Sequence, residues 1–136
     1  MTDNVKIRET DSRYLEFFAP ERHLKLEQLD YFSVRFKSVT IDCTARVYAY
    51  QDGKKLAMVF SEMAMEWRGW DGKKEWQSLE QEFDIACEIT KLGVVTINFS
   101  LTPSLDREWD VSSSISFGSG ELEVISKRIS SFFMHE

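Results

Sequence analysis

The stretch that decides the fold of this chain is residues 83–101, FDIACEITKLGVVTINFSL. Apolar residues alternate with polar ones over residues 83–89 and again over 95–101, which is the period of a half-buried β-strand. Between the two runs, Lys91, Leu92 and Gly93 supply a hairpin turn. The stretch therefore predicts two antiparallel strands, each with one face towards a core.

The pattern continues downstream of this hairpin. A third inward row consists of Trp109, Val111, Ile115 and Phe117, which extends the hairpin to a three-stranded meander. The period then becomes helical, with an apolar stripe of Leu122, Ile125, Ile129, Phe132 and Phe133. A C-terminal helix ending near Met134 is therefore expected, with this stripe facing the core.

A second helix is expected upstream of the meander. Its apolar residues lie on one stripe at helical spacing: Leu56, Val59, Phe60, Met63, Ala64 and Trp67. Asp52 is placed to cap the N-terminus of this helix, and Gly69 is placed to follow its last turn.

The first part of the chain is rich in strand patterns. Short alternating runs occur at residues 5–8, 14–18, 24–27, 32–36 and 39–47. The apolar positions change from even to odd numbers between the last two runs. A bulge or tight turn is therefore expected near Lys37 and Ser38, because a slip of one residue would turn every side chain over.

These elements predict an α+β fold in one domain, residues 1–136. We expect a curved, mainly antiparallel sheet or a two-layer β-sandwich, with an amphipathic central helix and a C-terminal helix.

Composition limits the partners. Lys and Arg total 17 and Asp and Glu total 23, which gives a formal net charge of −6. This excess of acid argues against a nucleic-acid-binding or membrane-binding face. The sequence shows no secretory signal or membrane-spanning run, so a cytoplasmic location is expected. Cys43 and Cys87 fall on apolar rows, which favours two buried thiols over a disulfide.

The sequence offers little for catalysis. The two histidines, His23 and His135, have no second metal ligand at a suitable spacing. No cofactor motif is recognised either. We therefore expect a protein that is not an enzyme and that has no metal site and no cofactor.

Three tryptophans lie close together, at Trp67, Trp70 and Trp76. Trp67 belongs to the apolar stripe of the central helix, and the other two flank a turn. The favoured interpretation is an aromatic corner that packs helix against sheet over Leu79. The alternative is an aromatic platform for a sugar or another small molecule at Trp70 and Trp76.

The acidic residues also follow a pattern. Glu80, Glu82, Asp84 and Glu88 share one parity opposite a core row, and Glu108 and Asp110 relate in the same way to Trp109 and Val111. No Lys or Arg has this parity within either stretch. An ordinary solvated face would explain the pattern. The functional hypothesis is a docking face for a basic protein, because clustered charge accelerates encounter with an oppositely charged partner.

The segment WRGWDG at residues 67–72, followed by EWQSLE at residues 75–80, resembles the signature of a bacterial family known as domain of unknown function 6228. The likeness in layout covers roughly residues 31–134, and it implies no catalytic residues. Size, charge and layout are also similar to immunity proteins that neutralise bacterial toxins. We therefore expect an immunity protein whose acidic face binds a basic toxin domain, such as a nuclease. The alternative is a small-molecule or carbohydrate-binding domain.

Overall fold

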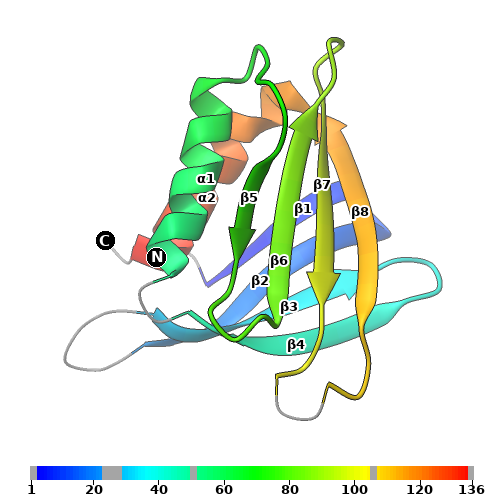
Figure 1. Ribbon diagram of the computed structural model, residues 1–136, viewed down its shortest axis with the longest axis vertical. Coiled ribbons are helices and arrows are strands. Elements are labelled where there is room, and N and C mark those ends of the chain that lie inside the picture. The colour runs from blue at the N-terminus through cyan, green and yellow to red at the C-terminus, as the bar shows by residue number, and fades with distance from the viewer. Residues whose placement is uncertain (1–2, 23–28, 50–51, 105–106, 135–136) are drawn as a thin grey trace.

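A computed structural model describes residues 3–22, 29–49, 52–104 and 107–134. The expected strand at residues 24–27 and both histidines, His23 and His135, lie outside these ranges. The described chain forms two four-stranded antiparallel sheets and two α-helices (Figure 1).

The first sheet has the order β1-β2-β3-β4, with β1 at Asn4–Thr10, β2 at Arg13–Arg22, β3 at Leu29–Lys37 and β4 at Asp42–Tyr48. Its even and odd positions alternate between core and solvent, as the sequence predicts. The expected change of parity occurs at a tight turn between β3 and β4. In this turn the Ser38 N–H donates a hydrogen bond to the Ile41 carbonyl at 2.7 Å.

The second sheet has the order β5-β6-β7-β8, with β5 at Lys74–Gln77, β6 at Phe83–Ile89, β7 at Val94–Leu101 and β8 at Val111–Gly118. The last three strands are the predicted meander. Gly93 closes the β6–β7 hairpin with φ of +82°, a conformation that favours glycine. The short edge strand β5 was not expected, because only four residues pair there and they show no repeated alternation.

The central helix α1 spans Gly53–Met65, and α2 spans Leu122–Met134 after a short 3₁₀ turn η1 at Ser119–Glu121. The two helices lie side by side and close one side of the space between the sheets (Figure 1). Gly53 permits their close approach, because a Cβ there would lie 2.7 Å from Phe133 Cδ1. Asp52 holds the N-cap position as expected, but its side chain makes no capping hydrogen bond.

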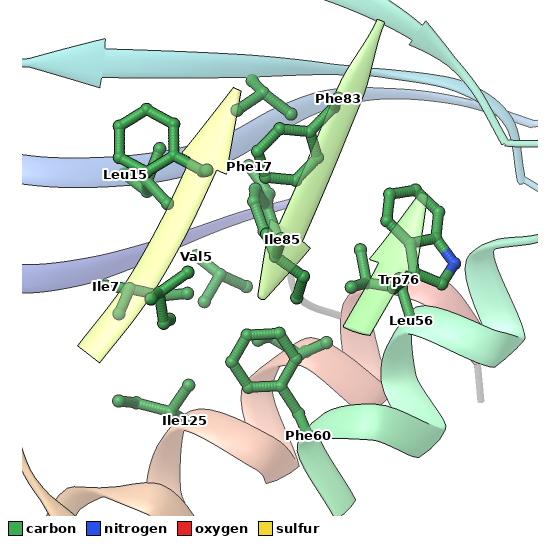
Figure 2. Close-up of a cluster of buried hydrophobic side chains, with 14 of the residues drawn as sticks. Val5, Ile7, Leu15, Phe17, Leu56, Phe60, Trp76, Phe83, Ile85 and Ile125 are labelled. Atoms are coloured by element: carbon green, nitrogen blue, oxygen red, sulfur yellow. The ribbon is translucent and has the colours of Figure 1, made fainter. Parts of the chain in front are cut away.

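The core fills the space between the two sheets and the helix pair (Figure 2). Phe17 of β2 lies at its centre, with its ring centroid 5.6 Å from that of Phe32 and 5.8 Å from that of Phe83. The entire predicted stripe of α2 is buried. Cys87 is buried and Cys43 half-buried, and both are free thiols. The predicted α+β class is therefore confirmed, in its two-sheet form.

Hydrogen bonds also join the sheets directly along the β1–β2 hairpin and β8. Arg13 Nη2 donates to Ser113 Oγ at 2.9 Å and to the Ser114 carbonyl at 2.6 Å. Glu9 Oε1 accepts the Ser116 N–H at 2.8 Å. These contacts hold β8 against the first sheet and leave the other face of β8 towards solvent.

Candidate functional site

The outer face of the second sheet is the region where the sequence predicts a site. Along β7 and β8 its side chains are small and polar: Thr96, Asn98, Ser100, Ser112, Ser114 and Ser116. Hydroxyls pair across the strands, with Thr96 Oγ1 2.8 Å from Ser116 Oγ and Ser100 Oγ 2.9 Å from Ser112 Oγ. We name these six residues the hydroxyl face. Because its side chains are short and partly paired with one another, a partner can approach it closely.

Carboxylates adjoin the hydroxyl face where β6 and β8 begin. Asp84 is half-buried, and burial raises the pKa of its carboxyl group; the negative charges of Asp110 and Glu75 raise it further, while the Ser100 backbone N–H opposes them. We name Glu75, Asp84 and Asp110 the carboxylate cluster. Within the described ranges, none of the three forms an ion pair with Lys or Arg. The cluster therefore concentrates negative charge that no Lys or Arg of the described residues neutralises through an ion pair.

Glu75 was not among the acidic site residues predicted from the sequence. It lies on β5, the strand that the sequence pattern did not reveal, and it pairs with Ala86 of β6. The only available signal was its place directly before Trp76, which is buried. Two-residue alternation is too short to establish a strand.

The prediction that Glu82 faces solvent is wrong. Its side chain is 1% exposed. Its Oε2 accepts the Tyr48 N–H at 2.7 Å, and its Oε1 accepts the Ser78 hydroxyl at 2.7 Å. The physical reason is the preceding turn: Gln81 has φ of +63°, and β6 begins only at Phe83. Glu82 therefore lies outside the strand alternation and turns inward to bind the edge of β4.

The other predicted acids are spread out. Glu80 lies exposed in the turn before β6, and its backbone carbonyl accepts Arg107 Nη2 at 2.8 Å. Glu88 faces outward on β6, but Lys73 Nζ lies 3.7 Å from its Oε1. Glu108 is exposed in the segment before β8. The six predicted acids therefore do not form one unneutralised strand face. Glu80 and Glu82 lie before β6 begins, and Glu88 forms an ion pair with Lys73.

Two of the three tryptophans predicted for the aromatic corner are held by hydrogen bonds from their indole N–H groups. Trp76 is buried, and its Nε1–H donates to the Asp52 carbonyl at 3.1 Å, which ties β5 to the start of α1. Trp70 is half-buried, and its Nε1–H donates to the Cys87 carbonyl at 3.2 Å. Leu79 is 64% exposed, so the expectation that the corner closes over it is wrong.

The core position predicted for Trp67 is also wrong. Helix α1 ends at Met65, and Glu66 leaves helical geometry with φ −104° and ψ 32°. For the same reason Gly69 does not directly follow the last turn. Trp67 is 49% exposed, and the guanidinium carbon of Arg68 lies 5.2 Å from its ring centroid. Trp67 continues the apolar stripe of α1 in the sequence, but the helix itself ends at Met65.

A hollow of about 530 Å³ lies beside Trp70. Two loops line it, residues 68–73 after α1 and residues 88–91 at the end of β6. Among the described residues, no group of three or more His, Cys, Asp or Glu side chains is arranged to hold a metal ion. Neither described α-helix has the length and apolar character needed to cross a membrane.

The fold and the site together define a class: a two-sheet α+β protein with a polar sheet face that carboxylates flank. The chain belongs to a family described as Family of unknown function (DUF6228), whose model matches residues 6–136. The resemblance expected from the tryptophan signature is thus confirmed. Searches of curated proteins and of solved structures gave no match.

Proposed function

We propose that this protein is a non-catalytic, cytosolic binding protein whose second sheet docks a basic protein. The observation that carries the proposal is the carboxylate cluster, in which Asp84 keeps a raised pKa beside Asp110 and Glu75. Like charges held together without a cation oppose folding. A basic partner would relieve that repulsion on binding, so the same charges that cost stability would favour the complex.

The cluster would act mainly on the rate of association. Charges on an exposed face attract an oppositely charged partner before contact, and dissolved salt screens that attraction over about 10 Å at 0.1 M ionic strength. The on-rate of the complex is therefore expected to fall as salt is added.

The hydroxyl face would supply the contact area. Short side chains lose little conformational entropy when they are covered. They also offer no large anchor, and the residues that dominate binding energies are most often Trp, Tyr and Arg. The partner must therefore supply the protruding side chains, with arginines placed to reach Asp84 and Asp110.

Among basic partners, we favour a toxin domain with a positively charged substrate channel, such as a nuclease. Such a channel is built to bind phosphates, and carboxylates can occupy the same cationic groups. A protein that blocks a toxin in this way is an immunity protein, which is the function expected from the sequence.

A charge-reversal experiment tests this proposal. The double variant Asp84→Lys/Asp110→Lys is compared with Glu121→Lys/Glu123→Lys, which changes the net charge equally at the start of α2. Binding kinetics are measured against the product of the neighbouring gene, and circular dichroism checks the fold of each variant. We expect the on-rate to fall at least about tenfold in the first variant and far less in the second.

Equal binding by both double variants would rule out the carboxylate cluster as the docking site. The milder variant Asp84→Asn/Asp110→Asn removes the charge with little change of shape. It should lose most of the salt dependence of the on-rate even if the lysine variant folds poorly.

The expected alternative, a carbohydrate platform formed by Trp70 and Trp76, is no longer available in that form. Trp76 is 7% exposed and its indole N–H is already bonded. Trp70 and Trp76 line separate hollows, of about 530 and 420 Å³, so the two rings do not form one platform.

A further inference from the structure

The hollow beside Trp70 has the size of a ligand site. Its volume of about 530 Å³ lies within the range of roughly 300–1,000 Å³ that is usual for small-molecule sites. Gly69 and Gly72 form part of its wall with φ of +142° and +71°. A Cβ at either glycine would meet no atom within 4 Å, so the space beside the loop is open.

The aromatic wall of this hollow is held in place from two directions. The Trp70 indole N–H donates to the Cys87 carbonyl of β6 at 3.2 Å. Lys74 Nζ lies 5.7 Å from the Trp70 ring centroid and is itself bound 2.7 Å from Glu66 Oε2. A ring fixed in this way loses little freedom when a ligand packs against it, as a pre-organised site requires.

Some of the charged side chains that line the hollow form ion pairs with one another, and others do not. Lys73 and Glu88 form an ion pair at 3.7 Å. Arg68 and Lys91 form no ion pair within the described part of the chain. Asp71 is the remaining charged residue of the lining. Besides this ion pair, the hollow offers two cations that have no acidic partner among the described residues, one further carboxylate and one indole.

We propose that this hollow binds a sugar ring that carries an anionic substituent, either a carboxylate or a phosphate. The apolar face of the ring would pack on Trp70, because indole rings provide a flat apolar surface beside polar groups. Arg68 and Lys91 would bind the anionic substituent through charge-assisted hydrogen bonds. Asp71 would accept hydrogen bonds from the sugar hydroxyls.

The proposal is independent of the docking function. The carboxylate cluster lies where β6 and β8 begin, whereas the hollow lies at the opposite end of β6. Of the six acids predicted for docking, Glu88 is the one that lines the hollow. Loss of sugar binding and loss of partner binding can therefore be produced by different variants.

Calorimetric titration with three ligands tests the proposal: glucuronate, glucose 6-phosphate and neutral glucose. We expect at least one of the two anionic sugars to bind at least tenfold more tightly than glucose, and their relative affinities identify the anion. Arg68→Gln and Lys91→Gln should each weaken that binding about tenfold. The control Lys55→Gln removes an exposed charge from α1 and should change nothing.

Tryptophan fluorescence provides the second readout. The anionic sugar should change the emission of the Trp67→Phe variant, in which Trp70 is intact, and should leave the emission of Trp70→Phe nearly unchanged. The Arg68 and Lys91 variants keep the test decisive if Trp70→Phe unfolds. Failure of both anionic sugars to bind at millimolar concentration, or equal affinity for glucose, would overturn the proposal.

Discussion

The outer faces of the two sheets are built on opposite principles. On the first sheet, long charged side chains neutralise one another. Arg35 binds Asp42 through two hydrogen bonds of 2.8 and 2.7 Å, and Arg46 binds Glu21 through two of 2.8 and 2.6 Å. The Arg46 guanidinium also lies 3.6 Å from the Tyr31 ring centroid. Four charged side chains of this face are thus paired with one another.

The second sheet has a face of short hydroxyl side chains, flanked by carboxylates that lack ion pairs within the described residues. The difference shows how part of the net charge of −6 is distributed: these arginines and acids of the first sheet are paired, whereas the carboxylate cluster of the second sheet has no ion pair within the described residues. A carboxylate cluster without ion pairs among the described residues is the arrangement expected of a surface that meets a charged partner.

The two cysteines provide the strongest contrast between the sheets. Burial raises the pKa of the Cys87 thiol in β6 to about 12, whereas Cys43 in β4 is only half-buried, with a pKa raised mainly by burial. A thiol-specific reagent should therefore modify Cys43 at least ~100-fold faster than Cys87. Mass spectrometry of the Cys43→Ser and Cys87→Ser variants at pH 8 measures both rates. Similar rates would show that the second sheet opens far more readily than its burial suggests.

Glu82, directly before β6, is an acid that does not fit this contrast, because its carboxylate accepts hydrogen bonds from the Tyr48 N–H and the Ser78 hydroxyl. Glu82→Ala removes the acceptor of both hydrogen bonds, so the free energy of unfolding should fall by about 3 kcal/mol. Urea unfolding measures the change. The control Glu80→Ala alters an exposed carboxylate two residues away and should change stability by less than about 0.5 kcal/mol.

Asp84 should behave in the opposite way. Its folded-state pKa is raised, so its ionised form opposes folding at neutral pH and its penalty disappears as the pH falls through that pKa. Asp84→Asn should therefore stabilise the protein at pH 7 by a few tenths of a kcal/mol, a small value because solvent screens a partly exposed group. Thermal unfolding at several pH values measures the gain, which should vanish below the usual Asp pKa of about 3.9. A gain that persists there would contradict this explanation.

Glu21 provides the corresponding test on the first sheet, where loss of the carboxylate should lower the stability of the protein. The hydrogen bond from Arg46 holds its pKa below the usual value, so its stabilisation is present above that value and is lost as the pH falls through the lowered pKa. Glu21→Gln should destabilise the protein at pH 7 by at most a few tenths of a kcal/mol, since the pair is exposed. Equal stability changes at pH 7 for Glu21→Gln and Asp84→Asn would remove the proposed difference between the faces.

The sequence predicted the regular parts of the fold because a repeated period is a local signal. Residues 83–101 alternate over two full strands, and the apolar stripe of α2 is buried at every predicted position. The signal failed where elements end. Trp67 continues the stripe of α1 in the sequence, but the helix stops at Met65.

The candidate site was predicted less well, for the same reason. Asp84 and Asp110 were predicted from their parity. Glu82 was assigned to the wrong face because Gln81, just before it, has a positive φ, and Glu75 was missed because its strand was not predicted. Parity assigns a side chain to one face of a strand, but it does not say where the strand begins.

The sequence by itself determined the α+β class, the family and the inward rows of the long strands, since each depends on residues that are close in the chain. Only the tertiary structure decided which charges are neutralised. Lys73, in the turn before β5, reaches Glu88 of β6, and Tyr48 of the first sheet binds Glu82 beside the second. Electrostatic energy depends on the distance between charges in space, and the order of residues does not contain that distance.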